Sequence, residues 1–222
     1  MSFVTVDMRR LAISDVPAAL VDGRRHVRAL RRDPGVRFAR LLGTAGPRFS
    51  PLDARPGRWA LVVSWAGEPP DPFAPWTRRI ARETAQLVGR PLWSRGRWDG
   101  RSAFDPLDTE PETWQGPLVV LTRSTLRVRQ AVAFHRRVPQ IAAEIARANP
   151  VVAFGIGEAP LLRQGTVSVW LSADALARFH RDSPAHRAAI SDTTTLGWYA
   201  EDLFVRMALV DARGSIDGVA LA

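Results

Sequence analysis

The sequence predicts an α+β fold made of two ferredoxin-like units, because one order of strands and helices, β-α-β-β-α-β, occurs twice in its 222 residues. Short segments with alternating apolar residues predict the strands, and longer amphipathic segments predict the helices. A polar, turn-rich stretch over residues 105–116 separates the two halves. Two such units in one chain predict an internally duplicated barrel with a shared core.

The first half contains four predicted strands and two predicted helices. In chain order these are a strand (3–13), a helix (15–34), two strands (36–46 and 58–67), a helix (72–89) and a short strand with a loop (90–100). The first helix ends at Asp33-Pro34, since proline cannot continue a helix. The second helix is predicted from an apolar face made largely by Ile80, Ala81, Ala85, Leu87 and Val88.

The second half repeats this order with more helix. The predicted elements are a strand (117–127), a helix (128–149), two strands (151–161 and 164–172), one or two helices (173–194) and a final strand within 198–210. Pro139 predicts a kink in the first of these helices. The repeat is one of element order, with little residue identity between the halves.

These elements give predicted boundaries. They are a first ferredoxin-like half at 1–104, a connecting loop at 105–116, a second half at 117–212 and a C-terminal tail at 213–222. The predicted architecture is a dimeric α+β barrel within one chain.

Composition narrows the function classes. The chain has no cysteine, which excludes disulfides, thiolate-ligated iron and iron–sulfur clusters. No apolar run is long enough to span a bilayer, and the N-terminus does not resemble a secretory signal, so we expect a cytoplasmic protein. Its net charge of +9 comes from arginines without any lysine. Because these arginines are spread along the chain without a nucleic-acid-binding motif, we expect no nucleic-acid partner.

Gly155-x-Gly157 follows an apolar run, as in a dinucleotide-binding turn. Such a turn needs a third glycine that opens a helix, but Pro160 occupies that position and a strand-like run follows. We therefore interpret the two glycines as a bulge or a site of close backbone approach.

Several longer stretches resemble the spheroidene monooxygenase family of the dimeric α+β barrel superfamily. They are FARLLGTAGPRFSPLD, WALVVSW, SRGRWDGRSAFDP, LTRSTLRVRQAVAFHRRVP, GIGEAPLLRQGTVSVW and GWYAEDLFVR, in the family's order from about residue 36 to about residue 210. The resemblance implies haem b as cofactor and an oxygenase that introduces a carbonyl into an acyclic carotenoid. His135 stands where the family usually has an aromatic residue. The family commonly has a Phe after a Gln–Thr pair, where this chain reads Gln164-Gly165-Thr166-Val167, so the substrate stays open.

Without cysteine, the axial ligand of a haem iron must be His, Met or Tyr. His186 follows Ser183-Pro184, where a helix is expected to begin, and small residues follow it. The family pattern places a histidine at this point, so His186 is our predicted iron ligand. His135 and His180 are the alternatives, and a structural histidine is the simpler interpretation of each.

Further residues are candidates for cofactor binding or catalysis. Haem propionates need cations, and Arg40 and Arg123 interrupt apolar runs that should point inward. Arg127 lies four residues beyond Arg123 and is therefore predicted on the same face of the strand. Gln164 is a candidate donor to an iron-bound oxygen species, and Arg123 is a second catalytic candidate. Trp170 and Trp198 are candidates to flank the porphyrin, although solvated arginines, a turn amide and core tryptophans explain these residues equally well.

The sequence thus predicts a haem-dependent monooxygenase of an apolar substrate, supplied by an electron donor or by peroxide. Two alternatives stay open: a haem enzyme of another type, such as an aldoxime dehydratase-like or peroxide-dependent enzyme, and a non-catalytic binder of haem or an apolar ligand. Peripheral membrane contact and a homodimer are compatible with the sequence.

Overall fold

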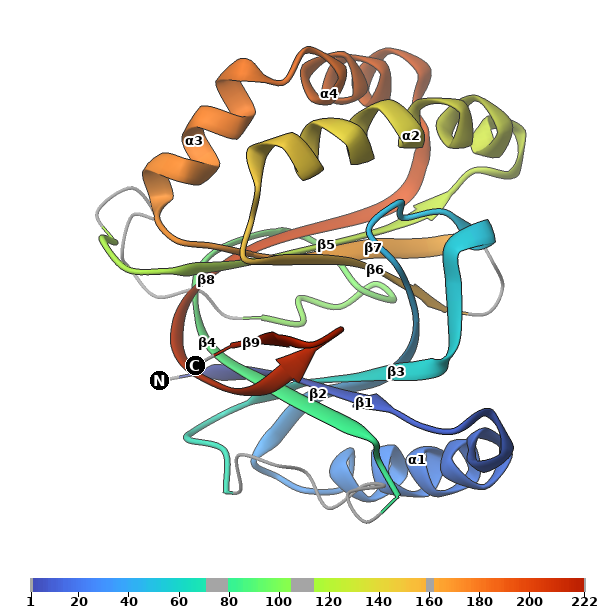
Figure 1. Cartoon of the computed structure of the whole chain (residues 1–222), viewed down its shortest axis with the longest axis vertical. Helices are drawn as coiled ribbons and strands as arrows, with labels where there is room; N and C mark the ends of the chain where they lie inside the picture. Colours follow the sequence, from blue (N-terminus) through green and yellow to red (C-terminus); the bar gives the residue numbers. More distant parts are fainter. Residues whose placement is uncertain (1, 71–79, 105–113, 159–161, 222) are drawn as a thin grey trace.

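A computed structural model describes residues 2–70, 80–104, 114–158 and 162–221 (Figure 1). The helices are α1 (Val16–Leu30), α2 (Ala131–Ala148), α3 (Ala173–Asp182) and α4 (Pro184–Leu196), with short 3₁₀ turns at Ile13–Asp15, Pro51–Asp53 and Val128–Gln130. The strands are β1 (Phe3–Arg10), β2 (Val36–Ala45), β3 (Ala54–Trp65), β4 (Glu83–Gly96), β5 (Leu118–Leu126), β6 (Val152–Glu158), β7 (Arg163–Trp170), β8 (Tyr199–Ile216) and β9 (Val219–Ala220).

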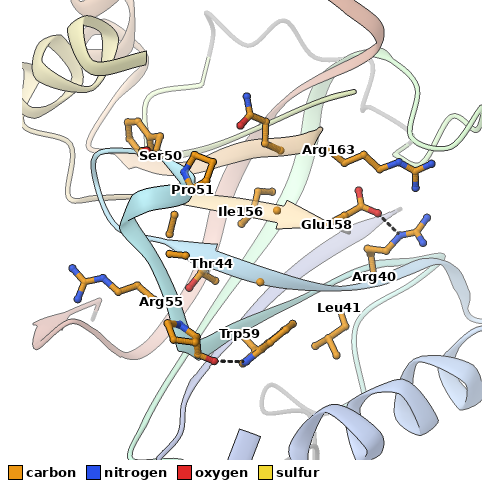
Figure 2. A pocket seen from close by; sticks show the side chains of 18 of the residues that line it. Arg40, Leu41, Thr44, Ser50, Pro51, Arg55, Trp59, Ile156, Glu158 and Arg163 are labelled. Carbon is orange, nitrogen blue, oxygen red and sulfur yellow. Dashed lines mark hydrogen bonds and ion pairs between the residues drawn. The ribbon is translucent and has the colours of Figure 1, made fainter. Parts of the chain in front are cut away.

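The strands close into an antiparallel barrel. Their order is β4-β1-β3-β2-β6-β7-β5-β8, and β8 pairs again with β4 to complete the ring. The two halves therefore meet at two seams, β4–β8 and β2–β6. The β2–β6 seam is short, with the three pairs Gly43–Gly157, Thr44–Ile156 and Ala45–Gly155 (Figure 2). This arrangement confirms the predicted α+β fold of two ferredoxin-like units.

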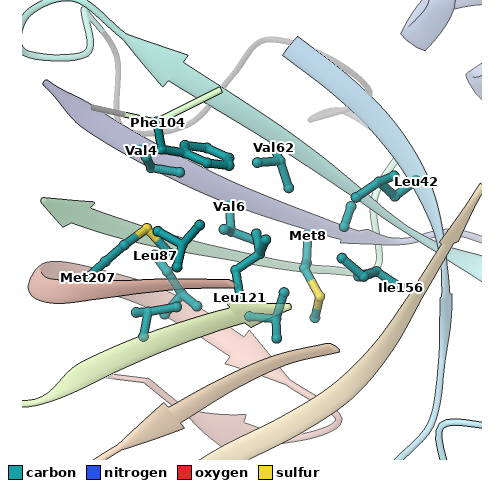
Figure 3. Close-up of a cluster of buried hydrophobic side chains, with 14 of the residues drawn as sticks. Val4, Val6, Met8, Leu42, Val62, Leu87, Phe104, Leu121, Ile156 and Met207 are labelled. Atoms are coloured by element: carbon teal, nitrogen blue, oxygen red, sulfur yellow. The ribbon is translucent and has the colours of Figure 1, made fainter. Parts of the chain in front are cut away.

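Side chains from both halves fill the interior of the barrel (Figure 3). Because residues along a strand alternate between its two faces, every second residue points into the barrel, and most of these residues are apolar. The labelled members of this core are Val4, Val6, Met8, Leu42, Val62, Leu87, Phe104, Leu121, Ile156 and Met207. Burial of one core shared by both sheets is what holds the two units together as one body.

Helices cover the outside of the barrel on two opposite sides (Figure 1). Val27 and Leu30 of α1 pack on the outer face of β2 and β3. On the other side, α2 and α3 pack on β5, β7 and β8 through a second cluster that includes Trp170, Leu176 and Phe179. This outer face of the second half is the one that carries His180 on α3 and His186 on α4.

The predicted helix over residues 72–89 is wrong where the structure describes it. Residues 71–79 lie outside the described residues, but Glu83–Gly96 form β4, which also contains the short strand predicted after residue 90. Ala85 and Leu87 point into the barrel core, while Gln86 donates to Asp7 on the neighbouring strand. These residues belong to a strand that pairs with β1 on one side and with β8 on the other. The periodicity of apolar residues does not distinguish such a central strand from a buried helix.

The C-terminal segment also differs from the prediction. Residues 213–220 continue β8 and form β9, because Gly214 and its neighbours pair with the start of β4, so this segment is not a free tail. Helix α2 runs through Pro139 from Ala131 to Ala148. Most of the predicted connecting loop, residues 105–113, lies outside the described residues.

We expect Gly165→Ala to destabilise the protein by about 1–3 kcal/mol, because a Cβ at this position of β7 would overlap the carbonyl oxygen of Thr122 on β5. Gly157→Ala is the matched control, since its Cβ would lie 3.7 Å from its nearest neighbour, the carbonyl oxygen of Arg163. Urea unfolding of both variants measures the difference. Equal loss of stability in the two variants would contradict the packing argument.

Candidate functional site

The predicted site residues lie in four places. His186 and Trp170 lie under the helices on the outer face of the second half, and Arg40 and Arg123 lie inside the barrel at one end. Arg127 and Trp198 lie near the start of β8, and Gln164 lines a cavity at the β2–β6 seam. The barrel wall separates His186 from the two interior arginines, so these residues cannot contact the same face of one small ligand.

His186 sits in the first turn of α4, which begins at Pro184. The carboxylate of Glu144 on α2 accepts hydrogen bonds from the backbone N–H of Ala185 (3.0 Å) and of His186 (3.1 Å). The hydroxyl of Ser183 also donates to Glu144. Glu144 thus caps α4 from a neighbouring helix, whereas the sequence predicts Ser183 as the cap.

The His186 imidazole is largely buried among rings. Its centroid lies 5.0 Å from that of Phe179 and 4.8 Å from that of His180. Burial lowers the pKa of His186, against the opposing effect of Glu144, and lowers the pKa of His180 to about 4. Both rings are therefore neutral at pH 7. The Nδ1 atom of His186 is buried and makes no hydrogen bond to any described residue.

Trp170 and Trp198 occupy different environments. Trp170 ends β7, packs against Phe179 at 5.2 Å between centroids, and donates its indole N–H to Ser168. Trp198 precedes β8 and packs edge-on against Phe134 of α2. The indole nitrogen of Trp198 is buried without a partner among the described residues. Only Trp170 shares a neighbour, Phe179, with His186.

Tyr199 is the only tyrosine of the chain and follows Trp198. Burial raises the pKa of Tyr199 to about 12, despite side-chain hydrogen bonds to Thr193 and Ser124. A neutral phenol is a weak iron ligand, so this pKa favours histidine over Tyr199 as a metal donor. Arg127 donates to the carbonyl oxygen of Tyr199 (3.1 Å) and is exposed, because β5 ends at Leu126. It therefore does not share the inward face with Arg123, contrary to the prediction from their spacing.

Arg40 and Arg123 point into the barrel, as their positions in apolar runs predict. There they form ion pairs with Asp99, Glu158 and Glu201. We call the two arginines and three acids together the interior ion cluster. Arg123 is 2% exposed and binds Glu158 (3.3 Å) and Glu201. The indole N–H of Trp98 also donates to Glu158 (3.0 Å).

The interior ion cluster holds the turn after β4 across one end of the barrel. Glu201 accepts from the backbone N–H of Asp99 (3.0 Å) and of Gly100 (2.6 Å), and Asp99 pairs with Arg40. Glu201 is thereby committed to this turn and to Arg123, so it does not orient His186. The carboxylate that does contact the His186 segment, Glu144, has no local sequence signal, because only the packing of α2 against α4 brings it there.

A cavity of about 750 Å³ lies at the β2–β6 seam (Figure 2). Its walls come from α1, β2, the loop before β3, the start of β3, β6 and the start of β7. Gln164 lines it together with Arg40, Glu158 and Arg163, whereas no histidine does. Sequence reasoning singled out Gly155-x-Gly157 but missed this cavity, because its walls are far apart in the chain.

The loop that forms one wall of this cavity is held by Asp53. The buried Asp53 carboxylate accepts from the backbone N–H of Arg48 (3.0 Å) and from its guanidinium (3.3 Å). Burial pushes the pKa of Asp53 up, but these hydrogen bonds and the nearby positive charge outweigh burial, and the pKa lies below its usual value of 3.8. A depressed folded-state pKa means that the ionised carboxylate stabilises the fold above pH 3.8 and loses that effect at lower pH.

We expect Asp53→Asn to lower the free energy of unfolding by about 1–2 kcal/mol at pH 7, because charged hydrogen bonds to Arg48 are lost. The difference from the parent protein should shrink as the pH falls below about 4, where Asp53 itself becomes protonated. Urea unfolding at steps from pH 7 to pH 3 measures both effects. Asp22→Asn, on an exposed carboxylate of α1, is the control and should change little; a pH-independent difference at Asp53 would contradict the role of its charge.

Within the described residues, no group of three or more His, Asp or Glu side chains could hold a metal ion. Separately, none of the described helices is both long and apolar enough to cross a membrane.

Comparison with known proteins agrees with this fold and assigns the chain to a protein family. No family model matches the chain. The spheroidene monooxygenase of Rhodobacter capsulatus is 32% identical over 199 residues, which cover 85% of this chain and 81% of that protein. The chain belongs to the spheroidene monooxygenase family. A second family member, from Rubrivivax gelatinosus, is 33% identical and covers 82% of this chain and 72% of that protein. A third, from Cereibacter sphaeroides, is 29% identical, and the match covers 83% of this chain and 59% of that protein.

Membership of the spheroidene monooxygenase family supports an oxidoreductase activity. Among solved structures, aldoxime dehydratase in complex with butyraldoxime superposes with a TM-score of 0.61 over 95% of this chain and 79% of that one. Its sequence identity is 12%, so this likeness concerns the fold alone. It agrees with the duplicated ferredoxin-like barrel and does not bear on the reaction.

Proposed function

We propose that this chain is a haem-dependent monooxygenase that oxidises an apolar, carotenoid-like substrate, with His186 as the ligand of the haem iron. The observation that carries the reaction class and the substrate class is the similarity to three spheroidene monooxygenases at 29%, 32% and 33% identity. The cofactor is proposed from the chemistry of the residues around His186.

The residues around His186 fit the needs of a haem ligand. The imidazole is neutral at pH 7 and can donate an electron pair, because burial lowers its pKa. Its buried Nδ1 has no hydrogen-bond partner among the described residues, and a buried polar atom in that state calls for an explanation such as a ligand. Phe179 packs against the imidazole and belongs to an apolar cluster that also contains Trp170. His180 and His135 remain alternative ligands.

Haem b, when bound, would supply activation of dioxygen or peroxide, which protein side chains alone do not provide. The contribution of the chain is then positioning. Glu144 fixes the start of α4 through three hydrogen bonds and so fixes the position of His186. Phe179, a member of the apolar cluster of α2, α3 and β7, packs against the imidazole and shields that side of the ring from water.

The proposed reaction consumes an oxidant and acts on an apolar chain. Conversion of a CH₂ group to a carbonyl is a four-electron oxidation, so a monooxygenase would carry it out in two rounds. Each round would consume one dioxygen with two electrons and two protons from a donor, or one peroxide, and the oxygen atoms that do not enter the product would leave as water. Arg40, Arg123, Arg127, Gln164 and Trp198 were candidates from the sequence. In the structure they lie away from His186, so in this proposal the propionates of the haem are not held by Arg40 or Arg123.

The test is turnover by the purified protein loaded with haem b. Incubation with spheroidene and either a reducing system with dioxygen or peroxide should give a product in which one CH₂ has become a carbonyl, detected by mass spectrometry and by a red shift of the polyene absorption. The same protein without haem is the control. Complete loading with haem and no oxidised carotenoid under either oxidant would refute the proposed reaction.

A further inference from the structure

We propose that the cavity at the β2–β6 seam is a binding site for an amphipathic carboxylate, an apolar body that ends in a negative charge. This site lies apart from His186 and goes beyond the proposed function, because a neutral carotenoid gives no reason for cationic groups at a cavity. The inference rests on four properties of the cavity: its volume and apolar walls, the built loop that forms one wall, the unpaired arginines, and the small residues along the seam.

The size and walls suit the body of an apolar ligand. The volume of about 750 Å³ lies in the range of small-molecule sites. Leu41 of β2 and Trp59 of β3 line one side (Figure 2), and Leu20 of α1 also lines the cavity. The indole N–H of Trp59 already donates to the carbonyl oxygen of Pro56 (2.9 Å), so the ring offers its apolar surface to the cavity.

The opposite wall is a loop that is built before any ligand arrives. Phe49 and Pro51 line the cavity, and Phe49 has a φ of 52°, a left-handed conformation that is costly for a side chain with a Cβ. The buried Asp53 holds this loop through Arg48 and through its own carbonyl oxygen, which accepts from Gly46 N–H (2.9 Å). Strain held in place by surrounding hydrogen bonds is typical of ligand sites.

Gly155 allows this loop to approach β6. A Cβ on Gly155 would lie 3.0 Å from the Cβ of Ala45 and 3.4 Å from the Cα of Phe49. The close backbone approach predicted for the Gly155-x-Gly157 motif is therefore made with the loop that carries Phe49. Across the seam, Gly43 and Gly157 pair and both line the cavity, so side chains do not fill it there.

The charges favour an anion. The lining contains four arginines, Arg24, Arg40, Arg55 and Arg163, against one acid, Glu158. Glu158 is already bound to Arg40 and Arg123. Arg24 and Arg55 are exposed and form no ion pair or hydrogen bond within the described chain. An arginine guanidinium can bind a carboxylate through two parallel hydrogen bonds, so these two residues are the expected anchors.

The first experiment measures binding by isothermal titration calorimetry, with dodecanoate and dodecanol kept below their aggregation limits. We expect dodecanoate to bind at least about tenfold more tightly than dodecanol, and its affinity to fall with added salt, because partly exposed charges are screened. Equal affinity for the two probes, or no binding of dodecanoate, would overturn the proposal. No haem is needed for this measurement, so its outcome is independent of the proposed function.

Two variants locate the site. Arg24→Gln/Arg55→Gln should weaken dodecanoate binding at least about tenfold, which corresponds to about 1.4 kcal/mol. Arg178→Gln/Arg181→Gln, on exposed positions of α3 away from the cavity, changes the net charge equally and should leave binding unchanged. An equal loss in both double variants would show a general charge effect and overturn the site.

Filling the cavity gives an independent check. Gly43→Val should block dodecanoate, since a Cβ there would lie 3.8 Å from Gly157 O and 4.0 Å from Trp59, which leaves the backbone undisturbed while the added methyl groups occupy the cavity. Circular dichroism checks that this variant is folded. A folded Gly43→Val protein with parental affinity would place the ligand elsewhere. If Gly43→Val does not fold, the surface arginine variants decide.

Discussion

His186→Ala is expected to abolish specific haem binding, seen as loss of the Soret band and at least about a hundredfold weaker haem affinity. Loss of residues that merely support a metal ligand already costs 10–100-fold in affinity, so loss of the ligand itself should cost more. Alanine removes the only group that the proposal gives to the iron. It leaves the first turn of α4 intact, because Glu144 caps the backbone N–H groups of Ala185 and His186.

Haem titration followed by absorption, oxidised and reduced with carbon monoxide, measures this effect. His135→Ala, on α2, and His26→Ala, on α1, are matched controls that remove a partly buried imidazole elsewhere, and both should keep the Soret band. His180→Ala should alter the affinity without abolishing it, since the ring of His180 packs against His186. A normal Soret band in His186→Ala together with its loss in His180→Ala or His135→Ala would transfer the ligand role to that residue.

The second large effect is expected for Arg123→Met, which should lower the free energy of unfolding by about 3–5 kcal/mol. Removing one partner of a buried ion pair leaves uncompensated charge, here on Glu158 and Glu201. Arg123 is 2% exposed, and Glu158 is 8% exposed, so water cannot replace the lost guanidinium. The turn after β4 should loosen as well, because Glu201 also holds the N–H groups of Asp99 and Gly100.

Urea unfolding compares Arg123→Met with Arg127→Met. The control removes an arginine from the end of the same strand, but Arg127 is exposed and makes one hydrogen bond to a carbonyl oxygen, so it should cost less than about 1 kcal/mol. A double variant, Arg123→Met with Glu158→Gln, should be less destabilised than Arg123→Met, because one unpaired charge is removed. Equal stabilities of the two single variants would contradict a structural role for the interior ion cluster.

Much of the fold could be predicted from the sequence, because the order of strands and helices along the chain follows from local patterns. The alternation of apolar residues indicates β2, β3, β5 and β7, and the Ser183-Pro184 break marks the division between α3 and α4. The inward direction of Arg40 and Arg123 follows from the same period of two. The absence of a third glycine after Gly157 excludes a dinucleotide turn, and these residues indeed form strand β6.

The errors share a cause. In the segment Ala85–Val88, apolar residues flank the polar Gln86, and a strand between two other strands can share this short pattern with a buried helix. Whether the segment has strand partners is decided by β1 and β8, of which the pairing part of β8 lies more than a hundred residues away. In the same way, the pairing of Gly214 with Ala85 turns a predicted tail into the end of a long strand.

The sequence by itself determined the order of elements, the duplicated fold and the family, because period and motif are local properties of the chain. The tertiary structure alone decided which side chains meet. Glu144 and His186 are 42 positions apart, and Arg123 and Glu201 are 78 apart; no spacing rule joins them. Closure of the barrel places the interior arginines and His186 on opposite sides of its wall, and it places the arginine-lined cavity at the seam. Contacts of this kind depend on how sheets and helices pack, which no local pattern records.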